Sequence, residues 1–164
     1  GMGMEHKTYE ADLFVWCQQQ ADGLRALSRS RRDLPDDLDL EHIAEEIEDM
    51  GRSELREATS LVRQICVRVI MAMSAPEAPD RARWRSEVVS WHNLLLDTIT
   101  PGMIDRIDIG VIWRRAVSEA KAALIEINVA PQAGLSFQAP LPADHFLDED
   151  FDYDATVARL GPTA

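Results

Sequence analysis

The feature that most constrains the fold is an apolar stripe recurring at every third or fourth residue from Leu40 to Ala72. It comprises Leu40, Ile43, Ile47, Gly51, Leu55, Ala58, Val62, Ile65, Val69 and Ala72. This spacing matches the 3.6-residue period of an α-helix and places these residues on one helix face. The sequence therefore predicts one long helix over about 40–74.

Gly51 lies inside this stripe, and the stripe keeps its phase through it. If the helix ended at Gly51, the apolar stripe after this residue would have no reason to match the phase of the stripe before it. The alternative is a break at Gly51, with Ser53 capping a new helix. A buried glycine costs about 1 kcal/mol relative to alanine in a helix. Its presence favours close approach of a neighbouring helix or of a partner chain.

Turn residues divide the rest of the chain into four more predicted helices. These span about 9–31, 80–99, 101–107 and 108–127. Each has a candidate N-cap, at Thr8, Asp80, Thr100 and Asp108. No segment alternates polar and apolar residues as a half-buried strand does. We expect an all-α protein, an antiparallel helical bundle of about five helices around the long central one.

The two ends of the chain differ from this pattern. Three prolines between residues 131 and 142 predict an extended segment without helix. We expect one short turn of helix near 143–149 and a frayed tail over 152–164. At the other end, Gly1 before Met2 is typical of a tag scar, and residues 1–8 are expected to be disordered. A single domain would then cover residues 9–151.

The charge of the chain excludes some classes of partner. The formal net charge is −12, with ten carboxylates and two arginines between Asp36 and Glu57, and six carboxylates without a base between Asp144 and Asp154. This sign repels nucleic-acid phosphates and anionic lipid. No run is long and apolar enough for a membrane span. Cys17 and Cys66 are expected to be free cysteines in the core, as in proteins of a reducing compartment. We expect a cytoplasmic protein without nucleic-acid or membrane partners.

Several segments together resemble a known family. YEADLFVWCQQQADGL, LDLEHIAEEIEDMGRSELRE, RARWR and HFLDEDF occur in this order, and EEIEDMGRSE is the most specific of them. They resemble the bacterial domain-of-unknown-function family 29, small helical proteins frequent in cyanobacteria. The family residues matched here are Glu45, Glu46, Glu48, Met50, Gly51, Ser53, Glu54, Arg56 and Trp84. The resemblance implies a helical fold and assigns no activity.

The family pattern has polar residues that this chain lacks. Where the family has a histidine followed by a lysine-tryptophan pair, near the end of the second long helix, this chain has RVIMAMSAP, with Arg68 at about the histidine position. After Trp84-Arg85 the chain continues with Ser86 instead of the family's threonine-isoleucine. An activity that depends on those residues is not expected here.

The acidic stretch of the long helix suggests one chemical alternative. His42, Glu45 and Glu46 share a helix face, and carboxylate-bridged metal centres in bundles use Glu and His at such spacings. A metal-binding helical-bundle enzyme would need partners from other helices, with His92 or Glu54 as candidates. The other interpretation is a solvated face, with Glu48 paired to Arg52. On that interpretation there is no catalytic residue, metal or cofactor.

The favoured function is a non-enzymatic interaction or regulatory module. The acidic face from Glu41 to Glu57 suits a basic protein partner. Glycine in the buried stripe and the tryptophans at helical spacing also fit a homodimer interface.

Overall fold

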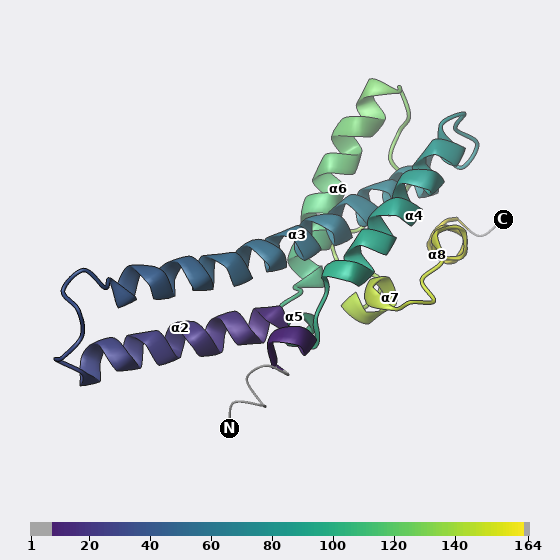
Figure 1. Cartoon of the computed structure of the whole chain (residues 1–164). Coiled ribbons are helices and arrows are strands. Elements are labelled where there is room, and N and C mark those ends of the chain that lie inside the picture. Colours follow the sequence, from purple (N-terminus) through teal and green to yellow (C-terminus); the bar gives the residue numbers. More distant parts are fainter. Residues whose placement is uncertain (1–7, 163–164) are drawn as a thin grey trace. The chain divides into compact units, whose positions relative to one another are not determined.

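The structure is a computed structural model that describes residues 8–162 and contains no strand within them. The long helix is confirmed: α3 (Leu40–Ser74) continues through Gly51, so the break at that glycine is excluded. Residues 8–11 are also helical, and the other helices are α2 (Leu13–Ser30), α4 (Arg81–Thr98), α5 (Pro101–Ile104), α6 (Ile109–Glu126), α7 (Ala143–Leu147) and α8 (Tyr153–Leu160) (Figure 1). The all-α fold class is therefore confirmed. The residues expected to be a disordered N-terminus lie, except for Thr8, outside the described part.

The chain divides into two compact units. The first comprises the chain up to Glu57 together with Ile99–Arg106, and the second comprises Ala58–Thr98 and the chain from Ile107 onward. The first part of α3 thus belongs to one unit and the second part to the other. That residues 9–151 fold as a single domain stays a prediction.

In the first unit, α2 lies antiparallel to the first part of α3 (Figure 1). Residues 8–11 are helical, but the helix expected over about 9–31 is interrupted at Asp12, which is the N-cap of α2. The reason is that Asp12 caps two helices. Its Oδ1 accepts a hydrogen bond from Val15 N at 3.0 Å, and its Oδ2 accepts one from Gly102 N, in α5, at 2.6 Å.

Asp12 also accepts a hydrogen bond from Thr100 Oγ1 at 2.7 Å and is buried. A buried carboxylate needs such donors to offset its desolvation. Glycine at position 102 permits the contact, because a Cβ there would lie 2.8 Å from Asp12 Oδ2 and 2.4 Å from Val15 Cγ2. Helix α5 ends at Ile104, short of the predicted residue 107.

The second unit holds most of the apolar core. The second part of α3 is joined to α6 by an ion pair between Arg63 and Glu119, and to α4 by one between Arg68 and Glu87. The fully buried large side chains of this unit include Val62, Ile65, Val69, Trp84, Leu95, Trp113 and Leu124. Asp108 caps α6 as predicted. The buried residues of α4 are Trp84, Val88, His92 and Leu95, whereas Trp91, whose place in the sequence predicted a buried position, is only half-buried.

The end of the chain departs from the sequence-based expectation. The short helix near 143–149 is present as α7, but residues Tyr153–Leu160 form α8 instead of a frayed tail. Tyr153 is buried, and its hydroxyl donates a hydrogen bond to Arg68 O at 2.8 Å. Asp154 forms ion pairs with Arg81 at 3.2 Å and with Arg85 at 2.7 Å. These long-range contacts explain why a segment with few apolar residues is ordered.

Between α6 and α7, residues 129–142 form neither helix nor strand, as the prolines predicted. Among the described residues, no helix combines the length and the apolar character needed to cross a bilayer.

Candidate functional site

Helices α2 and α3 approach each other closely at Gly51. Gly51 is buried, and a Cβ at this position would lie 3.1 Å from Cys17 Cβ and 3.6 Å from Phe14 Cδ2. The glycine therefore serves the helix-helix contact that its place in the stripe predicted. The two helices form a hairpin, called here the α2–α3 hairpin, whose two sides have different chemistry.

One side of the α2–α3 hairpin is polar. Glu48 accepts a hydrogen bond from Arg25 of α2 at 2.6 Å and another from Arg52 at 2.6 Å. Arg52 also pairs with Asp49. The guanidinium of Arg25, and next that of Arg52, holds the pKa of Glu48 below its usual value. The predicted pairing of Glu48 with Arg52 is confirmed, and Glu48 also ties α3 to α2.

The polar side has a cavity of about 380 Å³, near the lower end of the range of about 300–1,000 Å³ that small-molecule sites have. Its lining residues are Phe14, Gln18, Asp22, Glu48, Gly51, Arg52 and Arg106. Arg106 lies over the Phe14 ring with its guanidinium carbon 5.6 Å from the ring centroid. The charges of the residues that line this cavity are balanced, with Asp22 and Glu48 against Arg52 and Arg106. The carboxylate of Glu48 is already paired with Arg25 and Arg52.

The opposite side of the α2–α3 hairpin is apolar. Ile43 and Met50 of α3 are 40% and 43% exposed, and Ile47 between them is half-buried. On α2 the half-buried residues at the matching positions are Leu13, Trp16, Leu24 and Leu27. We call these seven residues the apolar face. The polar cavity residues Gln18 and Asp22 of α2, and Glu48 and Arg52 of α3, lie about 130–180° around their helices from the centre of this face, which places the apolar face on the other side.

The apolar face corrects one expectation. Ile43 and Ile47 belong to the stripe predicted to be buried, yet α2 covers Leu40, Ala44 and Gly51 instead. The physical reason is that one neighbouring helix covers only part of a helix circumference. A stripe wider than that contact leaves its second edge open.

The two histidines proposed for a metal centre, His42 and His92, each have another partner. His42 is exposed, and its Nδ1 lies 2.5 Å from Asp39 Oδ2, which raises the pKa of His42. His92 belongs to the other unit, is buried, and donates through Nε2 to Phe146 O at 3.0 Å. Glu45 and Glu46 are exposed. Within residues 8–162, no group of three or more His, Cys, Asp or Glu side chains is arranged to hold a metal ion.

The remaining family residues take different places. Gly51 and Trp84 are buried, Glu48 and Glu54 are half-buried, and Met50, Ser53 and Arg56 are exposed. The most specific segment of the sequence thus contributes to both sides of the α2–α3 hairpin.

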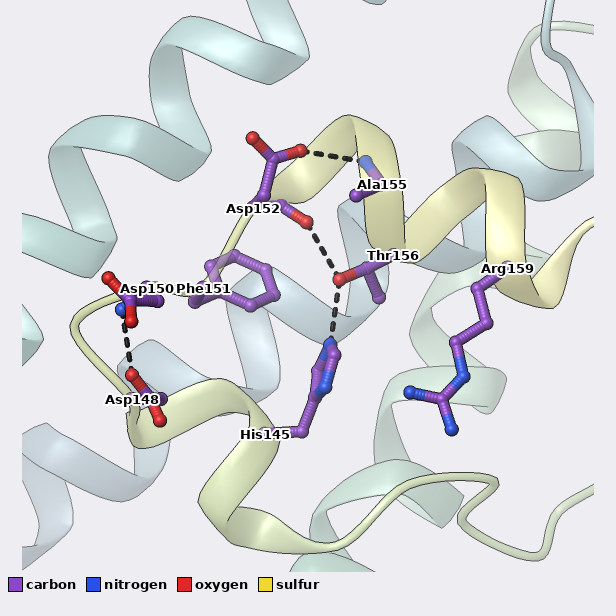
Figure 2. A pocket seen from close by; sticks show the side chains of 8 residues that line it. All are labelled: His145, Asp148, Asp150, Phe151, Asp152, Ala155, Thr156 and Arg159. Atoms are coloured by element: carbon purple, nitrogen blue, oxygen red, sulfur yellow. Dashed lines mark hydrogen bonds between the residues drawn. The ribbon is translucent and has the colours of Figure 1, made fainter.

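The second unit contains a cavity that the sequence did not predict. It measures about 330 Å³ and lies between α7, the following loop and α8 (Figure 2). It is lined by His145, Asp148, Asp150, Phe151, Asp152, Ala155, Thr156 and Arg159. Figure 2 shows His145 reaching up from α7 to Thr156, with Phe151 and Arg159 on its two sides. This site was missed because Thr156 and Arg159 lie in the segment expected to be frayed.

The tautomer of neutral His145 follows from its hydrogen bond. Thr156 Oγ1 donates its proton to Asp152 O at 2.7 Å, so it can only accept from His145 Nε2, which lies 2.8 Å away. Burial, and next the charge of Arg159, lowers the pKa of His145, although Asp148 acts in the opposite direction. His145 is therefore a neutral hydrogen-bond donor that fastens α7 to α8.

A comparison with protein families identifies the chain. The model of the family described as "Domain of unknown function DUF29" matches residues 8–152, so the chain belongs to that family. No curated protein matches the sequence. The family assignment agrees with the resemblance carried by EEIEDMGRSE and HFLDEDF, and it leaves the activity open.

Proposed function

We propose that this protein is a non-enzymatic interaction module whose apolar face docks against another protein chain. The observation that carries the proposal is the exposure of Ile43 and Met50 at helical spacing on α3. Half-buried residues of α2 extend the same surface across the α2–α3 hairpin. Contiguous apolar patches of this kind are typical of protein interaction sites.

The mode of docking follows from the secondary structure. Two antiparallel helices form a shallow groove between them, and a third helix can lie in such a groove with its own apolar residues facing inward. The hairpin contact at Gly51 and the ion pair between Arg25 and Glu48 hold the two walls of this groove together. The docking surface is thus organised before a partner arrives, which lowers the entropy cost of binding.

Site-specific photocrosslinking in the cells of origin tests the proposal. A photoreactive residue at position 50 should give a covalent adduct with a protein chain, identified by mass spectrometry. The same residue at position 125 is the control, because Ile125 is 73% exposed but lies on α6. The substitution Ile43→Lys should abolish the adduct at position 50. The proposal fails if position 50 gives no adduct, or if Ile43→Lys leaves it unchanged.

A further inference from the structure

The border of the apolar face carries charge of one sign. Glu46 and Glu57 are exposed and Glu54 is half-buried, and they lie within about 60° of Ile43 around α3. Within the described part of the chain, none of these three carboxylates forms an ion pair, unlike Glu48 and Asp49 on the other side. The arginines of this stretch, Arg52 and Arg56, lie about 180° and 140° from Ile43 around the helix.

The α2 part of the apolar face adds no base that could balance this charge. Between Leu13 and Leu27, the positions on this face recur at every third or fourth residue, and the only polar one among them is Gln20. Arg31, just after the end of α2, is held by Asp33 through hydrogen bonds of 2.8 Å and 2.7 Å. The apolar face is therefore negatively charged along its α3 edge and neutral along its α2 edge.

Resting on the proposed function, we propose that the occupant of the apolar face is a basic amphipathic α-helix of another protein. Its apolar residues would lie against Trp16, Ile43 and Met50, and lysines or arginines along one edge would pair with Glu46, Glu54 and Glu57. A helix that matches the 18 residues of α2 is about 27 Å long. A partner segment of about 18 residues thus suffices to cover the face.

Charge decides against a second copy of this chain as the occupant. Two apolar faces brought together would place acidic edges in one interface without a compensating base. Like charges brought together in a desolvated interface repel one another strongly, whereas lysine or arginine opposite the same carboxylates is attractive. The same argument excludes an acidic amphipathic helix.

Isothermal titration with two synthetic peptides tests the inference. One is an amphipathic Leu/Lys peptide of about 18 residues, and the other has Glu in place of each Lys. The Leu/Lys peptide should bind with one-to-one stoichiometry and more weakly as the NaCl concentration rises. The Leu/Glu peptide should not bind. The double substitution Glu46→Lys with Glu57→Lys should weaken binding at least about tenfold.

A matched control separates the face from the charge of the whole chain. Glu77→Lys with Glu126→Lys changes the net charge by the same amount at two exposed positions of the second unit. This variant should bind the Leu/Lys peptide within about twofold of the wild type. Equal weakening by both pairs would overturn the inference, because binding would then follow net charge alone.

Native mass spectrometry and the crosslinking experiment distinguish the two proposals. A dimer that Met50→Lys converts to a monomer would make a second copy the occupant, which overturns the basic-helix inference but keeps docking on the apolar face. Adducts at position 50 with a protein lacking a basic amphipathic helix would do the same. Absence of adducts, of a dimer and of peptide binding would overturn both.

Discussion

At the scale of single residues, two glycines inside helices have opposite surroundings. A Cβ at Gly51 would lie 3.1 Å from Cys17 Cβ, whereas a Cβ at Gly23 would meet nothing within 4 Å. Both glycines weaken their helices by about 1 kcal/mol relative to alanine. Only Gly51 has a packing role that offsets this cost. The sequence predicted that role because Gly51 keeps the phase of an apolar stripe, and Gly23 does not.

Substitution of these two glycines should therefore have opposite effects. Gly23→Ala should raise the free energy of unfolding by about 0.5–1 kcal/mol, since it adds helix propensity at an exposed position. Gly51→Val should lower it by about 1–3 kcal/mol, because a branched side chain would push α2 away from α3. Urea denaturation followed by circular dichroism measures both. A Gly51→Val protein as stable as the wild type would show that α2 does not approach α3 as described.

At the scale of elements, the hydrophobic period and the N-cap residues predicted a helix correctly where the residues that determine it are close in sequence. Asp108 caps α6 through Val111, and the period of α3 needs only its own residues. The double cap by Asp12 was missed because Gly102 is 90 residues away. Helix α8 was missed for the same reason: its anchors are Arg68, Arg81 and Arg85. A local sequence pattern cannot predict contacts with residues that are distant in sequence.

The joint between α7 and α8 should respond to pH. The pKa of His145 is lowered in the folded protein, so the unfolded chain, with a value of about 6.5, binds more protons. Stability from this group is therefore full above about pH 6.5 and is lost as the pH falls toward the folded pKa. Amide hydrogen exchange in α8, corrected for intrinsic rates, should accelerate between about pH 7 and pH 5.

Two variants control this experiment. His145→Gln should remove most of the pH dependence of exchange in α8. His42→Gln should leave it unchanged, because His42 lies in the other unit and its pKa is raised by Asp39 rather than lowered. Exchange in α8 that follows the same pH profile in wild type and His145→Gln would contradict a role for this histidine in fastening the helix.

At the scale of the whole molecule, the net charge of −12 destabilises the folded state, whereas the ion pairs stabilise it. Self-repulsion destabilises a compact state, and exposed ion pairs are worth little, so repulsion should dominate. Glu45, Glu46 and Glu57 are exposed, form no ion pair within residues 8–162, and contribute to this repulsion. Glu46 and Glu57, which also suit a basic partner, thus cost stability in the free protein.

Salt should therefore stabilise the free protein. Raising NaCl from about 0.01 M to about 0.1 M shortens the Debye length from roughly 30 Å to roughly 10 Å, which screens repulsion across the molecule. We expect the Tm, measured by calorimetry, to rise over this range. A variant with Glu45, Glu46 and Glu57 changed to Gln should have a higher Tm at low salt and a shallower rise. A Tm that falls with salt would mean that pairs such as Arg85 with Asp154 outweigh the repulsion.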